Sequence, residues 1–433
     1  MSVSGTYTET PAIFLRPRPL SRTPGSFMLL PLLPRPRPVK PLPAEVWSKV
    51  LSYVVDDEEG GRMGIPVRRA LLREKWKLLF VCKSWVNVVL PLLYSRVQIF
   101  TVTTLGKFVA HLSSSDTRWD SIRRIPYSTP GRWIALVHST DLLLVDSNIT
   151  RLFPLLPFLT SLYLVPEILL SNRALDALHI KDGIGQLRSL KGIKISAPVG
   201  HSSTLPLVPN PDAVIQLLQS CPRLEQLEIA CDPRSLREQG AALPPLLHLP
   251  NLKFLCLSAI PICRLFLAIL STPLPELRHL AVTPYGGQRT SQLSALLAAH
   301  GRGLPRHLLV PIGDLPAPPV LTSCPELHYL SLDRPLPVLT LPALAQDAES
   351  SHPHPLRVVT IPRPNARFLR EVEAVLPRLP SLTVVRVRAV RWLRSGVSGK
   401  ALEAGVQGEM RDWRCRLMRK GVRLVDNEWR DPE

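Results

Sequence analysis

Acidic side chains are scarce in this 433-residue chain, which has 34 Asp and Glu against 53 Lys and Arg and therefore a formal net charge of +19. Such an excess favours polyanionic partners, such as nucleic acid or an anionic membrane surface. Much of the excess is arginine near the two ends of the chain. Solvated terminal segments are the simpler interpretation of this pattern, and nonspecific binding of nucleic acid is the alternative.

Common catalytic motifs are also missing. A P-loop needs Gly-x4-Gly-Lys-Ser/Thr, but Gly399-Lys400 is followed by Ala401, and Arg394 stands where the first glycine is required. His352 and His354 lie between prolines, with no acidic or cysteine side chain at metal-ligand spacing. We therefore expect a protein with no enzymatic activity of its own, no cofactor and no metal ion.

Long hydrophobic runs are absent, although 45% of the residues are hydrophobic. No window offers about 18 uninterrupted apolar residues, so no membrane span is expected, and no secretory signal is recognised. The seven cysteines include no CxxC pair, and several lie in apolar periodic segments, as buried thiols do in a reducing compartment. The sequence predicts a soluble protein of the cytoplasm, the nucleus or both.

Proline, in contrast, is abundant, with 46 residues. This is about twice the usual share of roughly 5%, and proline is excluded from long helices and central strands. The sequence therefore predicts many short elements. Residues 1–40 contain two Arg-Pro-Arg-Pro runs and little to bury, which predicts a disordered Pro/Arg-rich tail.

Residues 42–54 predict a helix with one apolar face. Pro43 and Glu45 fall in its first turn, where a missing N–H costs nothing and a carboxylate complements the positive end of the helix dipole. Apolar residues then recur at helical spacing: Val46, Trp47, Val50, Leu51 and Val54.

A second helix is predicted over about 67–90, after the acidic and glycine-bearing run that begins at Asp56. Its apolar residues share one face by their spacing, and Pro91 ends the helix. The residues on this face are Leu78, Val81, Cys82, Trp85, Val88 and Val89.

These two stretches resemble the F-box, in the version common in fungal proteins. The resemblance rests on three pieces in order: Leu42-Pro43-x-Glu45-Val46-Trp47-x-x-Val50-Leu51, Leu79-Phe-Val81-Cys82-Lys-Ser-Trp85, and Pro91-Leu-Leu-Tyr94-Ser-Arg-Val97-x-Ile99. The last piece is similar to the exit from this domain into a first strand. The stretch from Asp56 to Arg73 is longer and more charged than the usual F-box linker.

The resemblance implies that residues 41–98 form an F-box-like helical domain, which docks on the Skp-type adaptor of a cullin-RING ubiquitin ligase. The residues it implies for adaptor binding are Leu42, Pro43, Glu45, Val46, Trp47, Val50, Leu51, Val81, Cys82 and Trp85. For the large side chains of this set, packing within the helical module is an equally good interpretation.

The rest of the chain repeats the phrase Leu-x-x-Leu-x-Leu, or a β-branched version of it. Copies begin at Leu159, Leu190, Leu224, Leu252, Leu277, Leu327, Leu356 and Leu382. A degenerate copy at Arg306-His-Leu-Leu-Val fills the long gap before Leu327. The other copies start about 25 to 34 residues apart, which is too regular for a chance effect of leucine content.

The phrase predicts a short strand with one buried face, in which positions 0, +3 and +5 pack inward and positions +1, +2 and +4 reach a shared surface. Helical pieces such as 211–220 are expected to cover the opposite side. Because one such repeat cannot bury its own face, neighbours stack into a solenoid. The pattern resembles leucine-rich repeats of the irregular kind that follow F-boxes.

The sequence thus predicts an α/β fold with a short N-terminal F-box-like helical module followed by an irregular leucine-rich-repeat solenoid of parallel strands plus helices. We expect the solenoid over 99–390 and a basic C-terminal helical tail over 391–433.

The predicted function is a substrate-recognition adaptor of a Skp–cullin–F-box-type ubiquitin ligase, with the Skp-type adaptor and the cullin scaffold as partners and no membrane. An unknown protein substrate would bind at strand positions of the solenoid: Glu225, Gln226, Lys253, Phe254, Arg278, His279, His328 and Tyr329. Two alternatives remain open. One is an interaction scaffold whose F-box-like helices only cap the solenoid, and the other is a nucleic-acid binder that uses the basic tails.

Overall fold

The computed structural model describes residues 13–15, 29–31, 43–55, 74–82, 85–86, 88–89, 92–93, 96–99, 101–114, 132–136, 142–156, 159–164, 168, 170–195, 211–231, 245–284, 289–304, 307–310, 320–332, 353–362, 366–388 and 406–430. By its internal contacts the chain divides into two units, Met1–Leu92 and Leu93–Glu433. Each unit is described separately.

In the N-terminal unit, β1 (Ile13–Leu15) pairs antiparallel with β2 (Leu29–Pro31). These two apolar segments belong to the tail that we expected to be disordered, and they form a short strand pair instead. The two Arg-Pro-Arg-Pro runs, one between the strands at residues 16–19 and one after them at residues 35–38, lie outside the described residues.

The first predicted helix is confirmed as α1 (Ala44–Val55). It begins directly after Pro43, whose carbonyl oxygen accepts hydrogen bonds from the backbone N–H groups of Val46 (3.1 Å) and Trp47 (3.2 Å). Glu45 lies in the first turn, as predicted.

The second predicted helix is interrupted. Residues 74–77 are helical, the 3₁₀ helix η2 (Leu78–Phe80) follows, and the chain turns at Val81. Here each backbone hydrogen bond joins residues three apart, as in a 3₁₀ turn. The Val81 N–H donates to the carbonyl of Leu78, and the Trp85 N–H donates to the carbonyl of Cys82. The prediction of one continuous helix is therefore wrong over 78–82, because apolar spacing does not distinguish an α-helix from tight turns. Residues 67–73 lie outside the described part.

The C-terminal unit contains a 12-stranded sheet whose strands follow chain order, and every pairing in it is parallel. The strands are β3 (Arg96–Ile99), β4 (Arg132–Leu136), β5 (Leu159–Leu164), β6 (Ser189–Ile195), β7 (Gln226–Cys231), β8 (Phe254–Ile260), β9 (His279–Pro284), β10 (His307–Val310), β11 (Tyr329–Leu332), β12 (Val358–Ile361), β13 (Val384–Val387) and β14 (Arg423–Val425).

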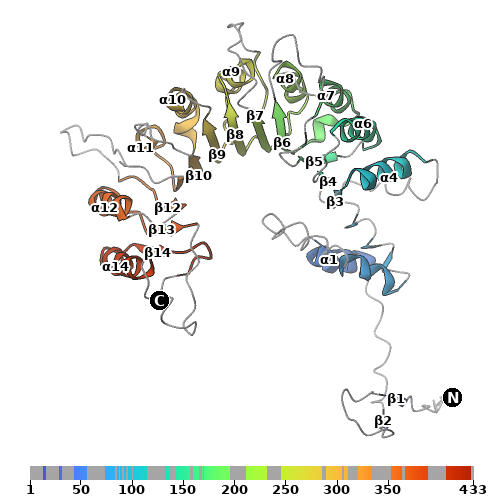
Figure 1. Ribbon diagram of the computed structural model, residues 1–433, viewed down its shortest axis with the longest axis horizontal. Coiled ribbons are helices and arrows are strands. Elements are labelled where there is room, and N and C mark those ends of the chain that lie inside the picture. Colours follow the sequence, from blue (N-terminus) through green and yellow to red (C-terminus); the bar gives the residue numbers. More distant parts are fainter. Residues whose placement is uncertain are drawn as a thin grey trace, which may run out of the picture. The chain divides into compact units, whose positions relative to one another are not determined.

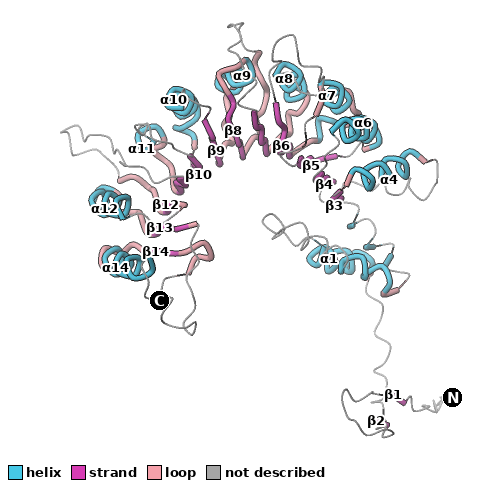
Figure 2. The backbone as a smooth tube through the Cα atoms, viewed as in Figure 1, coloured by secondary structure: helices cyan, strands magenta, loops and turns pink. Residues whose placement is uncertain are grey.

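Helices lie along one face of this sheet, and no described helix of the C-terminal unit lies on the other, which we call the open face (Figure 1 and Figure 2). The α-helices are α4 (Val102–Ser113), α6 (Leu142–Leu152), α7 (Asn172–His179), α8 (Pro211–Gln219), α9 (Arg264–Ser271), α10 (Arg289–His300), α11 (Val320–Ser323), α12 (Ala366–Val375) and α14 (Val406–Met418). Short 3₁₀ helices are η3 (Phe153–Leu155), η4 (Ile184–Gln186), η6 (Gly301–Gly303) and η7 (Leu376–Arg378).

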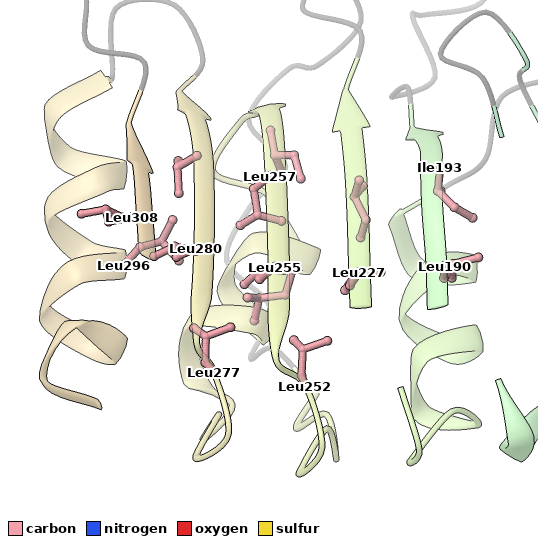
Figure 3. Close-up of a cluster of buried hydrophobic side chains, with 14 of the residues drawn as sticks. Leu190, Ile193, Leu227, Leu252, Leu255, Leu257, Leu277, Leu280, Leu296 and Leu308 are labelled. Atoms are coloured by element: carbon pink, nitrogen blue, oxygen red, sulfur yellow. The ribbon is translucent and has the colours of Figure 1, made fainter. Parts of the chain in front are cut away.

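The hydrophobic core fills the space between the sheet and the helices. Leu224, Leu227 and Ile229, at positions 0, +3 and +5 of one repeat, are fully buried. The corresponding leucines of neighbouring repeats form rows across the strands, as Figure 3 shows around Leu255 and Leu280. The predicted burial pattern of the repeats is therefore confirmed for the inward positions, and each row is shared between adjacent repeats.

The α/β class, with a parallel sheet and helices, is confirmed. Every copy of the repeated phrase, including the degenerate one before His307, coincides with a strand, and β3 forms where the first strand was expected. Two strands of this sheet, β4 and β14, were not predicted. The sheet also continues past residue 390, where we expected a helical tail. Trp413 and Leu417 of α14 are buried in the common core, and β14 pairs with β13.

Candidate functional site

One side of α1 presents an exposed apolar surface. Val46, Val50 and Val54, spaced by four residues, are 42%, 45% and 50% exposed, and Tyr53 beside them is 74% exposed. We call these four residues the α1 stripe. A contiguous exposed apolar row on a helix is typical of a surface that binds another protein.

The neighbouring side of α1 packs inside the N-terminal unit. Leu51 is buried, and the half-buried Trp47 contacts Trp85, with ring centroids 4.9 Å apart. The apolar face that we predicted for this helix is thus divided. Trp47 and Leu51 hold α1 to the following segment, whereas the valines remain at the surface.

The other residues implied for adaptor binding have mixed positions. Pro43 and Glu45 are exposed. Val81 and Cys82 are also exposed, so they do not join Trp85 on a buried helix face as their spacing predicted. The turn that follows η2 rotates them away from it. Leu42 lies outside the described residues.

The predicted substrate-binding residues gather on the open face of the sheet. Strand register places the side chains at position +2 in one row: Gln226, Phe254, His279, His307, Tyr329 and Val358. The residues at position +1 lie directly before the same strands and include Glu225, Lys253, Arg278 and His328. All eight predicted residues are half-buried.

Four rings of the +2 positions form a continuous row of contacts, which we call the ring row: Phe254, His279, His307 and Tyr329. Their centroids are 6.1, 5.4 and 4.2 Å apart in that order, and the last pair is stacked. The Lys191 ammonium lies 5.5 Å from the centroid of Phe254. The sequence analysis did not select His307, although the degenerate copy of the repeat places it at the same position as His279.

The far end of the ring row is fixed by hydrogen bonds. The hydroxyls of Tyr329 and Thr360 lie 2.6 Å apart. The Arg388 guanidinium donates to the carbonyl of Leu332 at 2.9 Å, and because β12 lies between β11 and β13, this side chain must cross β12. Ser331 and Thr360, at position +4, are consequently buried rather than exposed as predicted.

Charged groups flank the ring row. Glu225 accepts from Lys253 (3.0 Å) and Arg188 (3.4 Å), so its charge is already balanced by two cations. Glu228 is partly buried, which raises the pKa of its carboxyl, while the nearby Lys191 opposes this rise. Glu225 is thus paired with two cations, and Glu228 lies in the field of Lys191. Arg278 pairs with Glu276 at 3.3 Å, and Arg357 adds a positive charge just before β12.

Burial also governs the titrating groups of the open face. Desolvation raises the pKa of Cys256 to about 11, with a smaller contribution from Glu228, so the thiol stays protonated at neutral pH. Desolvation, together with the nearby His279 and Arg388, lowers the pKa of His307 to about 4. The imidazole of His307 is therefore neutral at pH 7.

The basic residues of α14 are partly engaged within the chain. Arg416 and Lys420 form ion pairs with Glu373 of α12 at 2.7 and 3.3 Å. Arg416 also lies over the ring of Trp413, 4.3 Å from its centroid. These contacts position α14 against α12. Part of the positive charge that we predicted for a basic tail is therefore paired within the C-terminal unit.

Within the described residues, no cluster of three or more His, Cys, Asp or Glu side chains has the geometry of a metal site. None of the described helices combines the length and the apolar character that crossing a bilayer requires.

No protein-family model matches the chain, and no curated protein matches it. Among solved structures, the chain is similar to a Bacteroides fragilis protein whose crystal structure was determined as a target of the Northeast Structural Genomics Consortium. The two share 12% sequence identity over 74% of each chain, with a TM-score of 0.31. A similarity at this level carries no argument about function.

Proposed function

We propose that the protein is a substrate-recognition subunit of a Skp–cullin–F-box-type ubiquitin ligase. In this proposal the N-terminal helices form an F-box-like module that binds the Skp-type adaptor, and the C-terminal sheet is an irregular leucine-rich-repeat solenoid that binds a protein substrate.

The observation that carries the proposal is the α1 stripe. Burying apolar surface is worth about 25 cal/mol per Å², so four exposed apolar side chains on one helix face are costly to leave in water. Trp47 and Leu51 already hold the helix in place from the adjacent side, so the stripe is available to a partner. A partner with an apolar groove matches this surface.

The main alternative is a scaffold in which the helical module only caps the first repeats. Such a module predicts no binding of the Skp-type adaptor, so adaptor binding separates the two proposals.

Co-purification with the Skp-type adaptor tests the proposal. We expect the full chain to retain the adaptor, and we expect the double substitution Val46→Asp/Val50→Asp to reduce the retained amount at least about tenfold, since both carboxylates would need to be desolvated on binding. The original sequence resemblance predicts the same loss for Leu42→Ala/Pro43→Ala.

Lys49→Asp serves as the matched control, because it places the same carboxylate at an exposed position of the same helix outside the stripe. It should keep at least half of the adaptor. Equal retention by the wild type and the stripe variant, or absence of adaptor with the wild type, would refute the ligase role.

A further inference from the structure

The ring row on the open face suggests the chemical class of the substrate. We propose that the row formed by Phe254, His279, His307 and Tyr329, with the cations beside it, binds an extended acidic segment of another protein. The proposal deepens the proposed function, because it rests on the open face being the surface that receives the substrate.

The first argument concerns which part of each ring, its edge or its face, is presented to a partner. Side chains stand roughly perpendicular to a sheet, and neighbouring strands are about 4.8 Å apart, so rings on adjacent strands pack side by side. Their interplanar angles along the row are 40°, 46° and 26°. Tyr329 covers one face of His307 at 4.2 Å, and Lys191 lies over a face of Phe254. A partner therefore meets mainly ring edges.

Ring edges carry partial positive charge, whereas ring faces are negative. The neutral imidazole of His307 keeps one N–H, which adds a hydrogen-bond donor to the row. Edges of this kind complement carboxylate oxygens better than they complement aliphatic or cationic groups.

The second argument is the charge along the row. Lys253 and Arg278 follow each other at position +1 of adjacent strands, beside Phe254 and His279. Lys253 is paired with Glu225, and Arg278 is paired with Glu276 at 3.3 Å. The four cations Arg188, Lys191, Lys253 and Arg278 outnumber the three carboxylates Glu225, Glu228 and Glu276, so the net charge beside the row is positive and attracts an acidic partner.

A single-stranded nucleic acid would also carry negative charge, but its binding depends on bases stacking on open ring faces. His307 and Tyr329 each have one face covered by the other, and the hydroxyls of Tyr329 and Thr360 lie within hydrogen-bond distance. The surface therefore favours a carboxylate-bearing peptide over a nucleic acid.

The length of the ring row determines the length of the peptide that is used as a probe. Three steps between strands span roughly 14 Å, which about four residues of an extended chain cover at roughly 3.4 Å each. A library of random displayed peptides about 12 residues long is therefore sufficient to sample the row and its flanks. The library is selected against the full-length wild-type chain.

We expect the selected peptides to be enriched in Asp and Glu. The double substitution Lys253→Glu/Arg278→Glu should weaken a selected peptide at least about tenfold, because two attractions become two repulsions and each exposed pair contributes a factor of about two to five. The matched control Arg173→Glu/Arg370→Glu reverses two exposed cations on helices α7 and α12 and should change binding by less than about twofold.

Phe254→Ala, which removes a ring without changing charge, should also weaken binding, with thermal unfolding used to verify that each variant is folded. Selection of no peptide, selection without acidic enrichment, equal loss in the control, or displacement by an oligo-dT strand at the same concentration would each overturn the proposal.

The result of the peptide-binding experiment can be separated from the result of the adaptor co-purification. Lys253→Glu/Arg278→Glu leaves the α1 stripe intact, so this variant should still co-purify with the Skp-type adaptor. Loss of acidic-peptide binding with normal adaptor retention supports the substrate proposal, whereas acidic-peptide binding without any adaptor retention refutes only the ligase role.

Discussion

Gly192 lies directly against the backbone carbonyl of Leu164, so closely that a Cβ atom on Gly192 would overlap the carbonyl oxygen. The residue has φ +76°, and it lies in the irregularity of β6 between Leu190 and Ile193. Two independent features, the close approach and the positive φ, therefore require glycine at this position.

We expect Gly192→Ala to lower the free energy of unfolding by at least about 3 kcal/mol, since left-handed backbone strain of about 1 to 3 kcal/mol adds to a backbone clash. Urea unfolding followed by circular dichroism measures the change. Gly303→Ala is the matched control, because a Cβ there meets nothing within 4 Å. Comparable stability of the two variants would contradict the prediction.

A buried carboxylate joins two repeats. The Asp146 side chain of α6 accepts hydrogen bonds from the Ser171 N–H and hydroxyl, both at 2.7 Å, and the Ser171 oxygen in turn accepts from Ala174 N–H at the start of α7. Asp146→Ala leaves the buried Ser171 N–H without its acceptor, which should cost about 1 to 3 kcal/mol of unfolding free energy. Asp176→Ala, exposed on α7, should stay within about 0.5 kcal/mol of the wild type in the same denaturation experiment.

The ring row should make stability depend on pH. The pKa of His307 is lowered from 6.5 to about 4 in the folded state, chiefly by burial, so between these values the unfolded chain binds a proton that the folded chain does not. His307 therefore does not reduce the free energy of unfolding above pH 6.5, where it is neutral in both states. The free energy of unfolding falls as the pH drops from 6.5 toward 4.

We expect His307→Phe, which keeps a ring in the row, to lose less stability between pH 7 and pH 5 than the wild type does. Urea unfolding at both pH values measures the difference. His300 and His354, whose pKa values burial also lowers, remain in both proteins and do not affect the comparison. Identical pH dependence in the two proteins would show that His307 is not the source.

The segment that we expected to be a basic tail gives a test of its own. Leu417 of α14 is fully buried, whereas the adjacent Met418 is 64% exposed. Leu417→Ala should cost about 2 to 5 kcal/mol, as for other buried leucines, and Met418→Ala should cost less than about 0.5 kcal/mol. A detached helical tail would make both substitutions neutral in thermal and urea unfolding.

Much of the sheet could be predicted because its signal is local. Each of the eight copies that begin with leucine has an aliphatic residue at position +3, as Leu224 and Leu227 illustrate, and the burial of an alternating strand follows from that alternation alone. β4 was missed because Arg132–Leu136 lacks the leading leucine, and its place depends on pairing with β3 and β5. β14 was missed because its three residues carry too short a pattern to be recognised.

The two candidate surfaces, the α1 stripe and the ring row, could be predicted from the sequence to different degrees. The apolar residues of α1 were identified by their spacing, but the division between the buried Leu51 and the exposed Val50 depends on where Trp85 packs. Likewise, the repeat alignment placed His279 and Tyr329 at equivalent positions, yet their ring contacts with His307 depend on strand register and side-chain direction.

By itself, the sequence determined the α/β class, the sites of most strands and the residues that face inward, because hydrophobic periodicity and proline content act over a few residues. Only the tertiary structure decided which exposed positions meet. The row from Phe254 to Tyr329 joins residues from four separate repeats. The hydroxyl of Thr360 in β12 and the guanidinium of Arg388, just after β13, lie at one end of it. Such contacts arise from stacking of the repeats, and no local pattern encodes their distances.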